Sequence, residues 1–222
     1  MSSLEDLTKR HYMYPYDPDF VEAMSAPDYD PHLDLAMHAG VLTAQQVENH
    51  KKGIENFKSI RQNYKKTNYS GTYKIGKDKL SRELRCSVQE AKKLLDDFWK
   101  RNWSIKKVAE DQKVKSVYGN KWLFNPTSGF YYSLRDEKDR FSTLNQSTGV
   151  YCFDLWIKEF RKIRPQLTAN FHDEVVLCVK KGNREKVRGL LQSSINKVNE
   201  KLKLNVKLSI DIKFGENYAD VH

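Results

Sequence analysis

The sequence predicts an α+β protein, with helices in the first half of the chain and antiparallel strands in the second. Residues 42–73 have the composition of a helix, and Thr43 is placed to cap its first turn. Two runs of apolar, aromatic and β-branched residues, 121–134 and 169–179, are each interrupted by turn-forming or charged residues, a pattern typical of β-hairpins. Residues 206–214 alternate apolar and polar side chains, which predicts a half-exposed strand.

The remaining elements follow from capping signals and periodicity. Residues 1–10 open a helix, whereas residues 12–31 are aromatic and rich in Pro and Asp, so we expect irregular structure there. The tetrapeptide Ser87-Val88-Gln89-Glu90 has the form of a capping box and predicts a helix start. Apolar spacing predicts long helices over residues 142–161 and 184–202.

The charge of the chain indicates a polyanionic partner. It has 222 residues, a formal net charge of +10 and a sequence pI of about 9.3. Residues 51–82 contain ten Lys or Arg against only Glu55 and Asp78. A solvated helix face usually mixes both signs, so this block is typical of a surface that binds phosphate groups.

Two other compositional features exclude classes of protein. Cys86, Cys152 and Cys178 are odd in number, far apart and without a C-x-x-C pair, so neither a disulfide framework nor a zinc site is expected. No apolar run reaches the roughly 18 residues of a membrane helix, and no secretory signal opens the chain. We therefore expect a soluble protein of the cytoplasm with no membrane partner.

Asp173 and Glu174 are adjacent carboxylates at the predicted turn of the 169–179 hairpin, after His172. Neighbouring like charges raise one another's pKa unless a cation lies against them. A pair of divalent metal ions in a phosphoryl-transfer site is such a cation. Solvated turn acids would give the same sequence, and so would a phosphohydrolase built on a His-Asp pair, although the latter needs further ligands on helices.

Arg61, Lys65, Tyr69 and Tyr73 recur at steps of four and so follow one face of the predicted helix. Cationic side chains pair with phosphate oxygens, and aromatic rings offer a flat surface for a base. The stripe can therefore hold a nucleoside triphosphate. The alternative is a basic helix whose two Tyr side chains pack into the core.

Four stretches together resemble the C-terminal part of family A DNA polymerases, the class of bacterial DNA polymerase I and many bacteriophage replicases. The stripe resembles their motif B, R-x3-K-x3-F/Y-x3-Y-G, and His172-Asp173-Glu174 resembles motif C. Gln146-Ser147-Thr148-Gly149 resembles the start of their Gln-bearing palm helix, and residues 215–222 resemble their closing G-x-N-W…H. The resemblance rests on the order and spacing of these four stretches.

The resemblance implies the helical fingers and antiparallel-sheet palm of a right-hand polymerase. Residues 1–24 would be a palm segment with the remainder of motif A, residues 25–112 the helical fingers, and residues 113–222 the palm with the His-Asp-Glu hairpin and the C-terminal strand. The resemblance also implies activity as a DNA-directed DNA polymerase, which adds dNTPs to a primer 3′ end by two-metal phosphoryl transfer.

Five residues would bind the incoming dNTP. By the resemblance, Arg61 and Lys65 contact the triphosphate, and Lys65 also donates a proton to the leaving pyrophosphate. Tyr69 stacks on the sugar and base. His32 lies in residues 30–36, which resemble the family's D-I-H-x-x-T-A, and would be a further phosphate contact unless it is an ordinary surface histidine. Glu5, in residues that resemble motif A, would exclude the ribose 2′-hydroxyl and bond to Tyr69.

The remaining roles concern the metals and the DNA. Asp173 would coordinate two Mg²⁺ ions with Glu174 as a supporting acid, and His172 would lie close to the primer end. Tyr73 would lie near the templating base. Gln146 would contact the duplex minor groove, where the acceptor pattern is nearly independent of sequence.

The sequence departs from the family pattern in ways that imply a partner. Lys74 replaces the Gly that normally follows motif B, and motif A, D-x-S-x-x-E…H, matches Ser2, Glu5 and His11 but places its Asp one residue before Met1. One carboxylate cannot clamp two ions. We therefore expect a split, phage-type polymerase whose N-terminal fragment supplies the motif A Asp, the thumb and possibly an exonuclease, joined either non-covalently or by intein splicing.

Without that fragment the palm strands would be incomplete, so the chain alone would expose a sheet edge and apolar surface. If phage-encoded, the protein would work in the cytoplasm of a bacterial host. The alternative hypothesis is a non-catalytic nucleic-acid-binding accessory protein derived from a polymerase, in which only the basic block matters.

Overall fold

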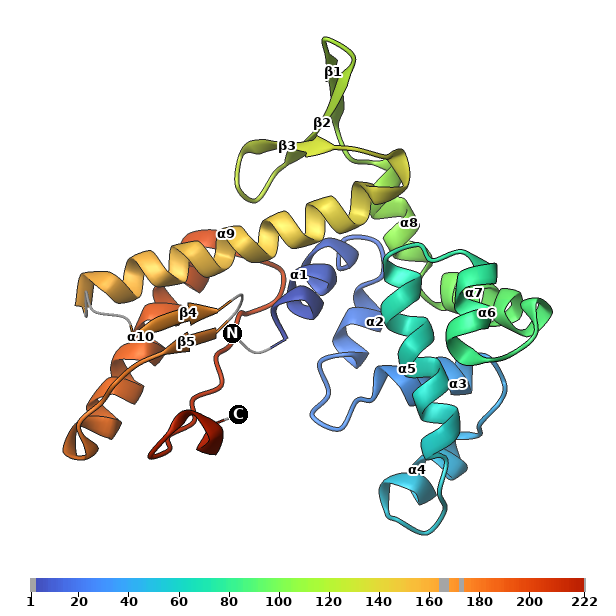
Figure 1. Cartoon of the computed structure of the whole chain (residues 1–222), viewed down its shortest axis with the longest axis horizontal. Helices are drawn as coiled ribbons and strands as arrows, with labels where there is room; N and C mark the ends of the chain where they lie inside the picture. Colours follow the sequence, from blue (N-terminus) through green and yellow to red (C-terminus); the bar gives the residue numbers. More distant parts are fainter. Residues whose placement is uncertain (1–2, 164–167, 172–173, 222) are drawn as a thin grey trace. The chain divides into compact units, whose positions relative to one another are not determined.

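The computed structural model describes residues 3–163, 168–171 and 174–221. The chain divides into two compact units, which we treat separately. The strand-bearing unit comprises residues 1–12, 122–132 and 143–222, and the helical unit comprises residues 13–121 and 133–142. The predicted α+β class is confirmed, since helices dominate and the strands pair within two small sheets (Figure 1). The predicted boundaries at residues 24 and 112 stay a prediction.

The helical unit is built from short helices. They are α2 (Pro18–Ala23), α3 (Pro31–His38), α4 (Ala44–Lys51), α5 (Lys58–Thr72), α6 (Lys77–Leu84), α7 (Val88–Arg101) and α8 (Trp103–Glu110), followed by β1 (Val114–Val117) and, further on, a 3₁₀ turn over Glu137–Asp139. The helix cap predicted at Thr43 and the capping box predicted at Ser87 are both present, and the cap at Thr43 is a capping box as well. Among the described residues, no helix is long and apolar enough to cross a membrane.

Two predictions for this unit were wrong. The single helix expected over residues 42–73 is interrupted after α4, where Gly53 takes a φ of 74° that terminates a helix readily. Residues 12–31 are not wholly irregular, because Pro18 opens α2 with the fixed φ that suits a first helical turn. In both cases one residue decides the local structure against the composition of the longer stretch. A Gly ends a helix in a stretch of helical composition, and a Pro begins one in a stretch of irregular composition.

Helices α3, α5 and α7 pack against one another and form the centre of the helical unit. Arg101 of α7 donates to both carboxylate oxygens of Asp34 in α3, at 2.8 and 3.2 Å. Gly71 of α5 is buried against Phe98 of α7, which is 1% exposed. A Cβ at Gly71 would lie 2.7 Å from the Phe98 ring, so the glycine allows the two helices to approach this closely.

We predict that Gly71→Ala destabilises the protein by about 1–3 kcal/mol, because the new methyl group overpacks the buried ring of Phe98. Gly189→Ala is the matched control, since Gly189 lies in a helix and a Cβ added there would have nothing within 4 Å. That substitution should stabilise by up to about 1 kcal/mol through helix propensity alone. Urea unfolding of both variants checks this, and a gain in stability for Gly71→Ala would contradict the packing argument.

The strand-bearing unit combines three helices with the paired strands. It contains α1 (Leu4–Met13), the β2–β3 pair (Asn120–Asn125 and Phe130–Leu134), α9 (Arg140–Ile163), β4 (Ala169–Phe171), β5 (Glu174–Val176), a 3₁₀ turn over Lys181–Asn183, α10 (Arg184–Leu202) and a last 3₁₀ turn over Tyr218–Asp220. The predicted hairpin over 121–134 is confirmed and gains β1 as a third strand in the order β1-β2-β3.

The core of this unit lies between α9 and α10. Apolar side chains of both helices are buried there, including Phe153, Trp156, Phe160, Leu191 and Ile195. The Trp156 indole N–H donates to the Ser194 hydroxyl at 2.8 Å, which satisfies a buried polar group. The two helices therefore form an apolar layer on which the hairpin and the C-terminal segment rest.

Strands β4 and β5 pair antiparallel, with Phe171 opposite Glu174 and Ala169 opposite Val176. The hairpin predicted around the His-Asp-Glu motif is therefore present, although His172 and Asp173 themselves lie outside the described residues. The prediction of a paired strand over residues 206–214 was wrong. Its side chains do alternate between half-buried and exposed, but no strand of the described chain pairs with it.

Candidate nucleotide and nucleic-acid site

The predicted stripe lies on the outward face of α5. Tyr69 is 59% exposed and Tyr73 is 42% exposed, so neither Tyr side chain packs into the core. The opposite face of the helix is buried through Tyr64, Thr67 and Gly71. Helix α5 therefore packs against α3 and α7 through its buried face, and Tyr69 and Tyr73 lie on its exposed face.

Arg61, at the start of the stripe, is held by Asp30. The Arg61 Nε donates to Asp30 Oδ2 at 2.6 Å, and the other Asp30 oxygen accepts from the backbone N–H groups of His32 and Leu33. Burial alone would raise the pKa of Asp30, but the hydrogen bonds from Arg61 and the two amides lower it overall. A single carboxylate therefore caps α3 and fixes the first cation of α5.

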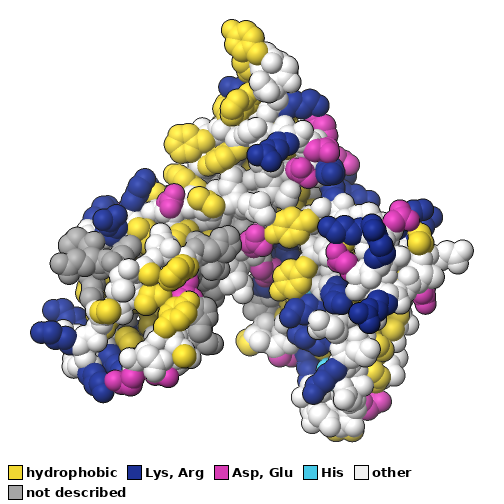
Figure 2. Space-filling view, viewed as in Figure 1, with side chains coloured by type: hydrophobic (Ala, Val, Ile, Leu, Met, Phe, Trp, Pro, Cys, Tyr) yellow, Lys and Arg dark blue, Asp and Glu magenta, His cyan; other side chains and the backbone are white. Residues whose placement is uncertain are grey.

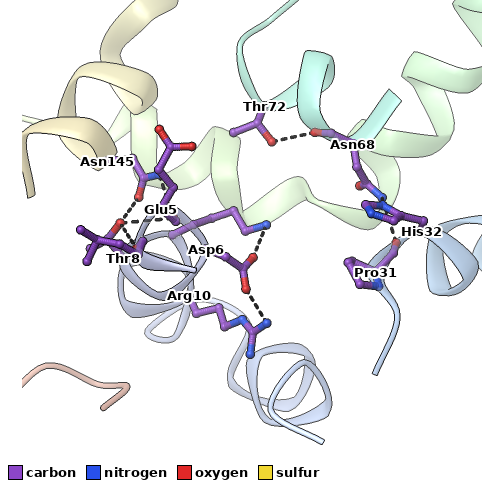
Figure 3. Close-up of polar contacts among 11 residues, drawn as sticks. Glu5, Asp6, Thr8, Arg10, Pro31, His32, Asn68, Thr72 and Asn145 are labelled. Carbon is purple, nitrogen blue, oxygen red and sulfur yellow. Dashed lines mark hydrogen bonds and ion pairs between the residues drawn. The ribbon is translucent and has the colours of Figure 1, made fainter. Parts of the chain in front are cut away.

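His32 is placed against the middle of the stripe. Its side chain is buried, and its Nδ1 lies 3.1 Å from the amide nitrogen of Asn68, which also donates to the Pro31 carbonyl at 2.9 Å. The His32 and Tyr69 ring centroids are 5.9 Å apart at a tilted angle. Figure 3 shows the Asn68 side chain bridging to the start of α3. The structure thus brings two predicted dNTP-binding residues, His32 and Tyr69, together.

Charge on this face is strongly positive. Lys and Arg side chains gather over α5 and α6 in Figure 2. Within the described part of the chain no carboxylate pairs with Lys65, whereas Arg61 is paired with Asp30. Of the two cations of the stripe, only Arg61 is therefore neutralised by a carboxylate among the described residues.

Helix α5 ends in a left-handed turn at Lys74. The N–H of Ile75 donates to the Ser70 carbonyl at 3.1 Å and the N–H of Lys74 to the Gly71 carbonyl at 2.9 Å, which is the Schellman pattern. Lys74 has a φ of 52°, a conformation that glycine adopts at little cost. Lys74 thus adopts a backbone conformation for which Gly is suited, and the turn that ends α5 is formed at the expense of backbone strain.

We predict that Lys74→Gly raises the free energy of unfolding by about 0.5–1 kcal/mol, because it relieves the left-handed backbone strain. Lys74→Ala is the control, since it removes the same charge while keeping a Cβ. Chemical denaturation of the two variants checks this prediction. An equal gain in both would mean that the charge, not the backbone, limits stability here.

Glu5 and Gln146 are two of the predicted site residues of the strand-bearing unit, and a polar contact between α1 and α9 lies beside both. The Thr8 hydroxyl donates to the Asn145 side-chain oxygen at 2.8 Å, and the Asn145 amide donates to the Glu5 carbonyl at 3.0 Å (Figure 3). Asn145 is buried and Gln146, the next residue, is exposed. Because Asn145 is anchored, α9 presents Gln146 to solvent.

A second buried network fixes the same two helices to the β2–β3 turn. The Tyr12 hydroxyl lies 2.7 Å from both the Thr127 and the Thr148 hydroxyls. The Asn125 amide donates to Ser147 at 2.8 Å and to Thr148 at 2.9 Å. The polar residues after Gln146 in the predicted palm-helix motif are therefore buried hydrogen-bonding groups, and only Gln146 of the three faces solvent.

His11, which matches the last position of motif A, is half-buried and bonds to neutral groups. Its Nδ1 accepts from the Asn205 backbone N–H at 3.1 Å, and the Asn205 side-chain amide donates to the His11 carbonyl at 2.9 Å. Burial lowers the pKa of His11 to about 4. The imidazole is therefore neutral at physiological pH and connects α1 to the segment that follows α10.

We predict that the protein loses stability as the pH falls from about 6.5 to about 4. In that range the unfolded chain protonates His11, whose ordinary pKa is 6.5, and the folded chain does not, so each step down in pH favours unfolding. The loss attributable to this residue is on the order of 2 kcal/mol. Urea unfolding at pH 7 and pH 5 measures it, and His11→Gln should reduce the difference. An unchanged pH dependence in that variant would contradict the assignment.

The predicted metal ligand is not among the described residues. Asp173 and His172 lie outside them, whereas Glu174 opens β5 and is half-buried. Within the described ranges, no three His, Cys, Asp or Glu side chains cluster closely enough to hold a metal ion. Glu5 belongs to the strand-bearing unit and Tyr69 to the helical unit, so the predicted bond between them stays a prediction.

Sequence reasoning missed two positioning residues, Asp30 and Asn68. Asp30 stands directly before a proline, the arrangement of an N-cap followed by Pro at the first helical position, so the capping role was available from the sequence. Asn68 lies seven residues after Arg61 and hence on the same side of α5. Its contact with α3 required knowledge of which helix packs there.

Comparisons with known proteins provide independent evidence about the fold. No protein-family model matches the sequence, and no curated protein matches it either. Among solved structures, the chain is similar to the POL domain of Pol1 from M. smegmatis in complex with DNA primer-template and dNTP, with a TM-score of 0.71 and 17% sequence identity. The likeness covers 100% of this chain and 39% of that one.

At this identity the likeness establishes the fold alone. The chain has an α+β, DNA polymerase-like fold. It spans 39% of the length of the solved polymerase domain, so its fold corresponds to a part of that domain. The particular resemblance to family A polymerases rests on the sequence motifs described above.

Proposed function

We propose that the chain is the C-terminal fingers and palm part of a template-directed DNA polymerase that adds dNTPs to a primer 3′ end. An N-terminal part would supply the first catalytic Asp, the thumb and possibly an exonuclease. We further propose a family A enzyme of bacteriophage type. What supports the proposal is a polymerase-like fold over the whole chain together with motifs B and C in the expected order.

The observation that carries the proposal is the outward stripe on α5. Exposed aromatic and half-buried basic side chains on one helix face, with the His32 ring against Tyr69, suit a ligand that has both phosphates and a flat base. Tyr69 and Tyr73 contribute little to the core, because 59% and 42% of their surface is exposed. The solved M. smegmatis domain is itself in complex with DNA primer-template and dNTP, which are ligands of this kind.

Three residues of the stripe, and His32 beside it, have distinct parts in this proposal. Lys65 would bind the triphosphate and protonate the leaving pyrophosphate, a transfer that a positioned acid accelerates. Arg61 would bind the phosphates by exchanging its bond to Asp30 for one to the nucleotide. Tyr69 would stack on the base, and His32 would add a phosphate contact. Positioning and charge stabilisation would supply most of the catalysis.

The metals require residues beyond those described. The described side chains do not fit an ion by themselves, since none of them forms a cluster of three ligands. We propose that Asp173, with Glu174 beside it, holds two Mg²⁺ ions together with the motif A Asp of the N-terminal part. When bound, such ions activate the attacking 3′-hydroxyl and neutralise charge on the phosphates.

We predict that Lys65→Ala lowers the kcat/KM for dNTP incorporation by about 100-fold or more, because it removes the acid and a phosphate contact. Lys66→Ala is the matched control, since this neighbouring lysine lies off the stripe and donates to the Glu83 carbonyl. Primer extension with template-primer, dNTPs and Mg²⁺ measures both, using the complex with the N-terminal part. Equal losses would indicate a general effect of charge.

The same assay tests the metal ligand. Asp173→Asn should abolish extension, whereas Asp154→Asn, on the exposed face of α9, should leave it unchanged. The accessory-protein alternative is favoured by the uneven charge, because DNA binding by the basic face requires no carboxylate. That alternative predicts salt-sensitive DNA binding that neither Asp substitution alters, and no extension from the complete complex.

A further inference from the structure

The side-chain amide of Asn68 in α5 lies against two atoms at the start of α3. Its nitrogen is 2.9 Å from the Pro31 carbonyl oxygen and 3.1 Å from His32 Nδ1 (Figure 3). A carbonyl oxygen only accepts hydrogen bonds, so the amide atom that faces it is the nitrogen, which only donates. The reversed amide would place two acceptor oxygens against each other. The contact with Pro31 therefore fixes the orientation of the Asn68 amide.

The orientation of this amide determines which nitrogen of His32 carries a proton. Because the Asn68 nitrogen can only donate, His32 Nδ1 is the acceptor of the 3.1 Å hydrogen bond. A neutral imidazole has one N–H group and one acceptor nitrogen. With Nδ1 as the acceptor, the proton of the neutral ring lies on Nε2. The contact thus selects one of the two tautomers of His32.

Neighbouring groups also hold the His32 ring in place. Tyr69, the residue after Asn68, has its ring centroid 5.9 Å from that of His32. The His32 side chain is buried, and its backbone N–H donates to Asp30 Oδ1 at 2.9 Å. Turning the ring over about its Cβ–Cγ bond would exchange Nδ1 for a carbon atom and lose the hydrogen bond from Asn68. The orientation and the tautomer of the ring are therefore fixed together.

We propose that Asn68 is a positioning residue that holds His32 as the Nε2–H tautomer, so that the neutral imidazole donates a hydrogen bond to a phosphate oxygen of the incoming dNTP. Phosphate oxygens are strong hydrogen-bond acceptors. The other neutral tautomer would direct an acceptor nitrogen at them and would first have to take up a second proton. In taking dNTP as the ligand, the inference rests on the proposed function, and it adds the residue that prepares His32 for binding.

Substitutions at residue 68 can change this hydrogen bond while keeping the size of the side chain. Asp has nearly the shape of Asn but presents only acceptor oxygens when ionised, so Asn68→Asp should favour the proton on Nδ1 of His32. The side chain introduced by Asn68→Leu neither donates nor accepts. Asn63, which is exposed on the same helix, is the matched control site, because its substitution by Asp or Leu leaves the contact with α3 intact.

Nitrogen-15 NMR of the histidine rings tests the proposal on the full chain without any ligand. At about pH 8 an ordinary histidine is neutral, and the couplings of each ring nitrogen to the carbon-bound protons distinguish the two tautomers. His32→Gln identifies the signals of His32. The wild type and Asn63→Asp should show His32 protonated on Nε2, and Asn68→Asp should show it protonated on Nδ1. An Nδ1–H tautomer in the wild type, or an unchanged tautomer in folded Asn68→Asp, would overturn the proposal.

Primer extension by the complex with the N-terminal part measures what the tautomer contributes to nucleotide binding. Asn68→Leu should raise the KM for dNTP by about 10-fold or more, because His32 then lacks the group that selects its donor form. In a His32→Gln background the same substitution should change the KM by no more than about 2-fold. Asn63→Leu should leave the KM unchanged in both backgrounds. Equal increases for Asn68→Leu in the two backgrounds would mean that Asn68 does not act through His32, and would overturn the proposal.

Failure of this proposal and failure of the proposed function give different results. A His32 tautomer that changes with residue 68, together with a complex that never extends a primer, would support the selection of the tautomer by Asn68 and contradict the polymerase assignment. Primer extension by a complex whose His32 is protonated on Nδ1 would retain the polymerase assignment and overturn the role of Asn68. The NMR measurement therefore does not depend on catalysis.

Discussion

The helical unit depends on the carboxylate of Asp30. One of its oxygens caps α3 through two backbone amides, and the other accepts from the Arg61 guanidinium of α5. The cap fixes where α3 begins and so where His32 lies, and the ion pair fixes how α5 presents its stripe. Seven residues further along α5, Asn68 repeats the connection by bonding to both Pro31 and His32. Two sets of polar contacts thus connect α3 to α5.

In the strand-bearing unit, hydrogen bonds between neutral groups hold the elements together. Tyr12, Asn125 and Thr148 are buried, and each bonds to the others, so α1, the β2–β3 turn and α9 are joined without a buried charge. Neutral networks avoid the large desolvation penalty of an ion pair, yet leaving one member unpaired is still costly. Such a network specifies one arrangement, and it determines which residues of α9, Gln146 among them, remain exposed. The buried hydrogen bonds thus hold the exposed part of α9 in one position.

Sequence patterns predicted those parts of the fold that depend on local signals. The cap at Thr43, the capping box at Ser87, the long α9 and the hairpin around the His-Asp-Glu motif follow from spacing and residue type. The exposure of Tyr69 could not be predicted, because a stripe on a helix is equally compatible with core and surface. The left-handed Lys74 had no sequence signal, since lysine rarely adopts this conformation. Only the turn that ends α5 imposes it.

The segment 206–214 shows why a correct local pattern can still give no strand. Its alternation is visible in the sequence and again in the burial of its side chains, so the conformational preference is satisfied. A strand, however, is defined by the backbone beside it, and no strand of the described chain pairs with this segment. Its apolar side chains pack instead against the layer formed by α9 and α10. Alternation in the sequence therefore predicts which side chains are buried, whereas pairing depends on a second segment and is encoded in neither one alone.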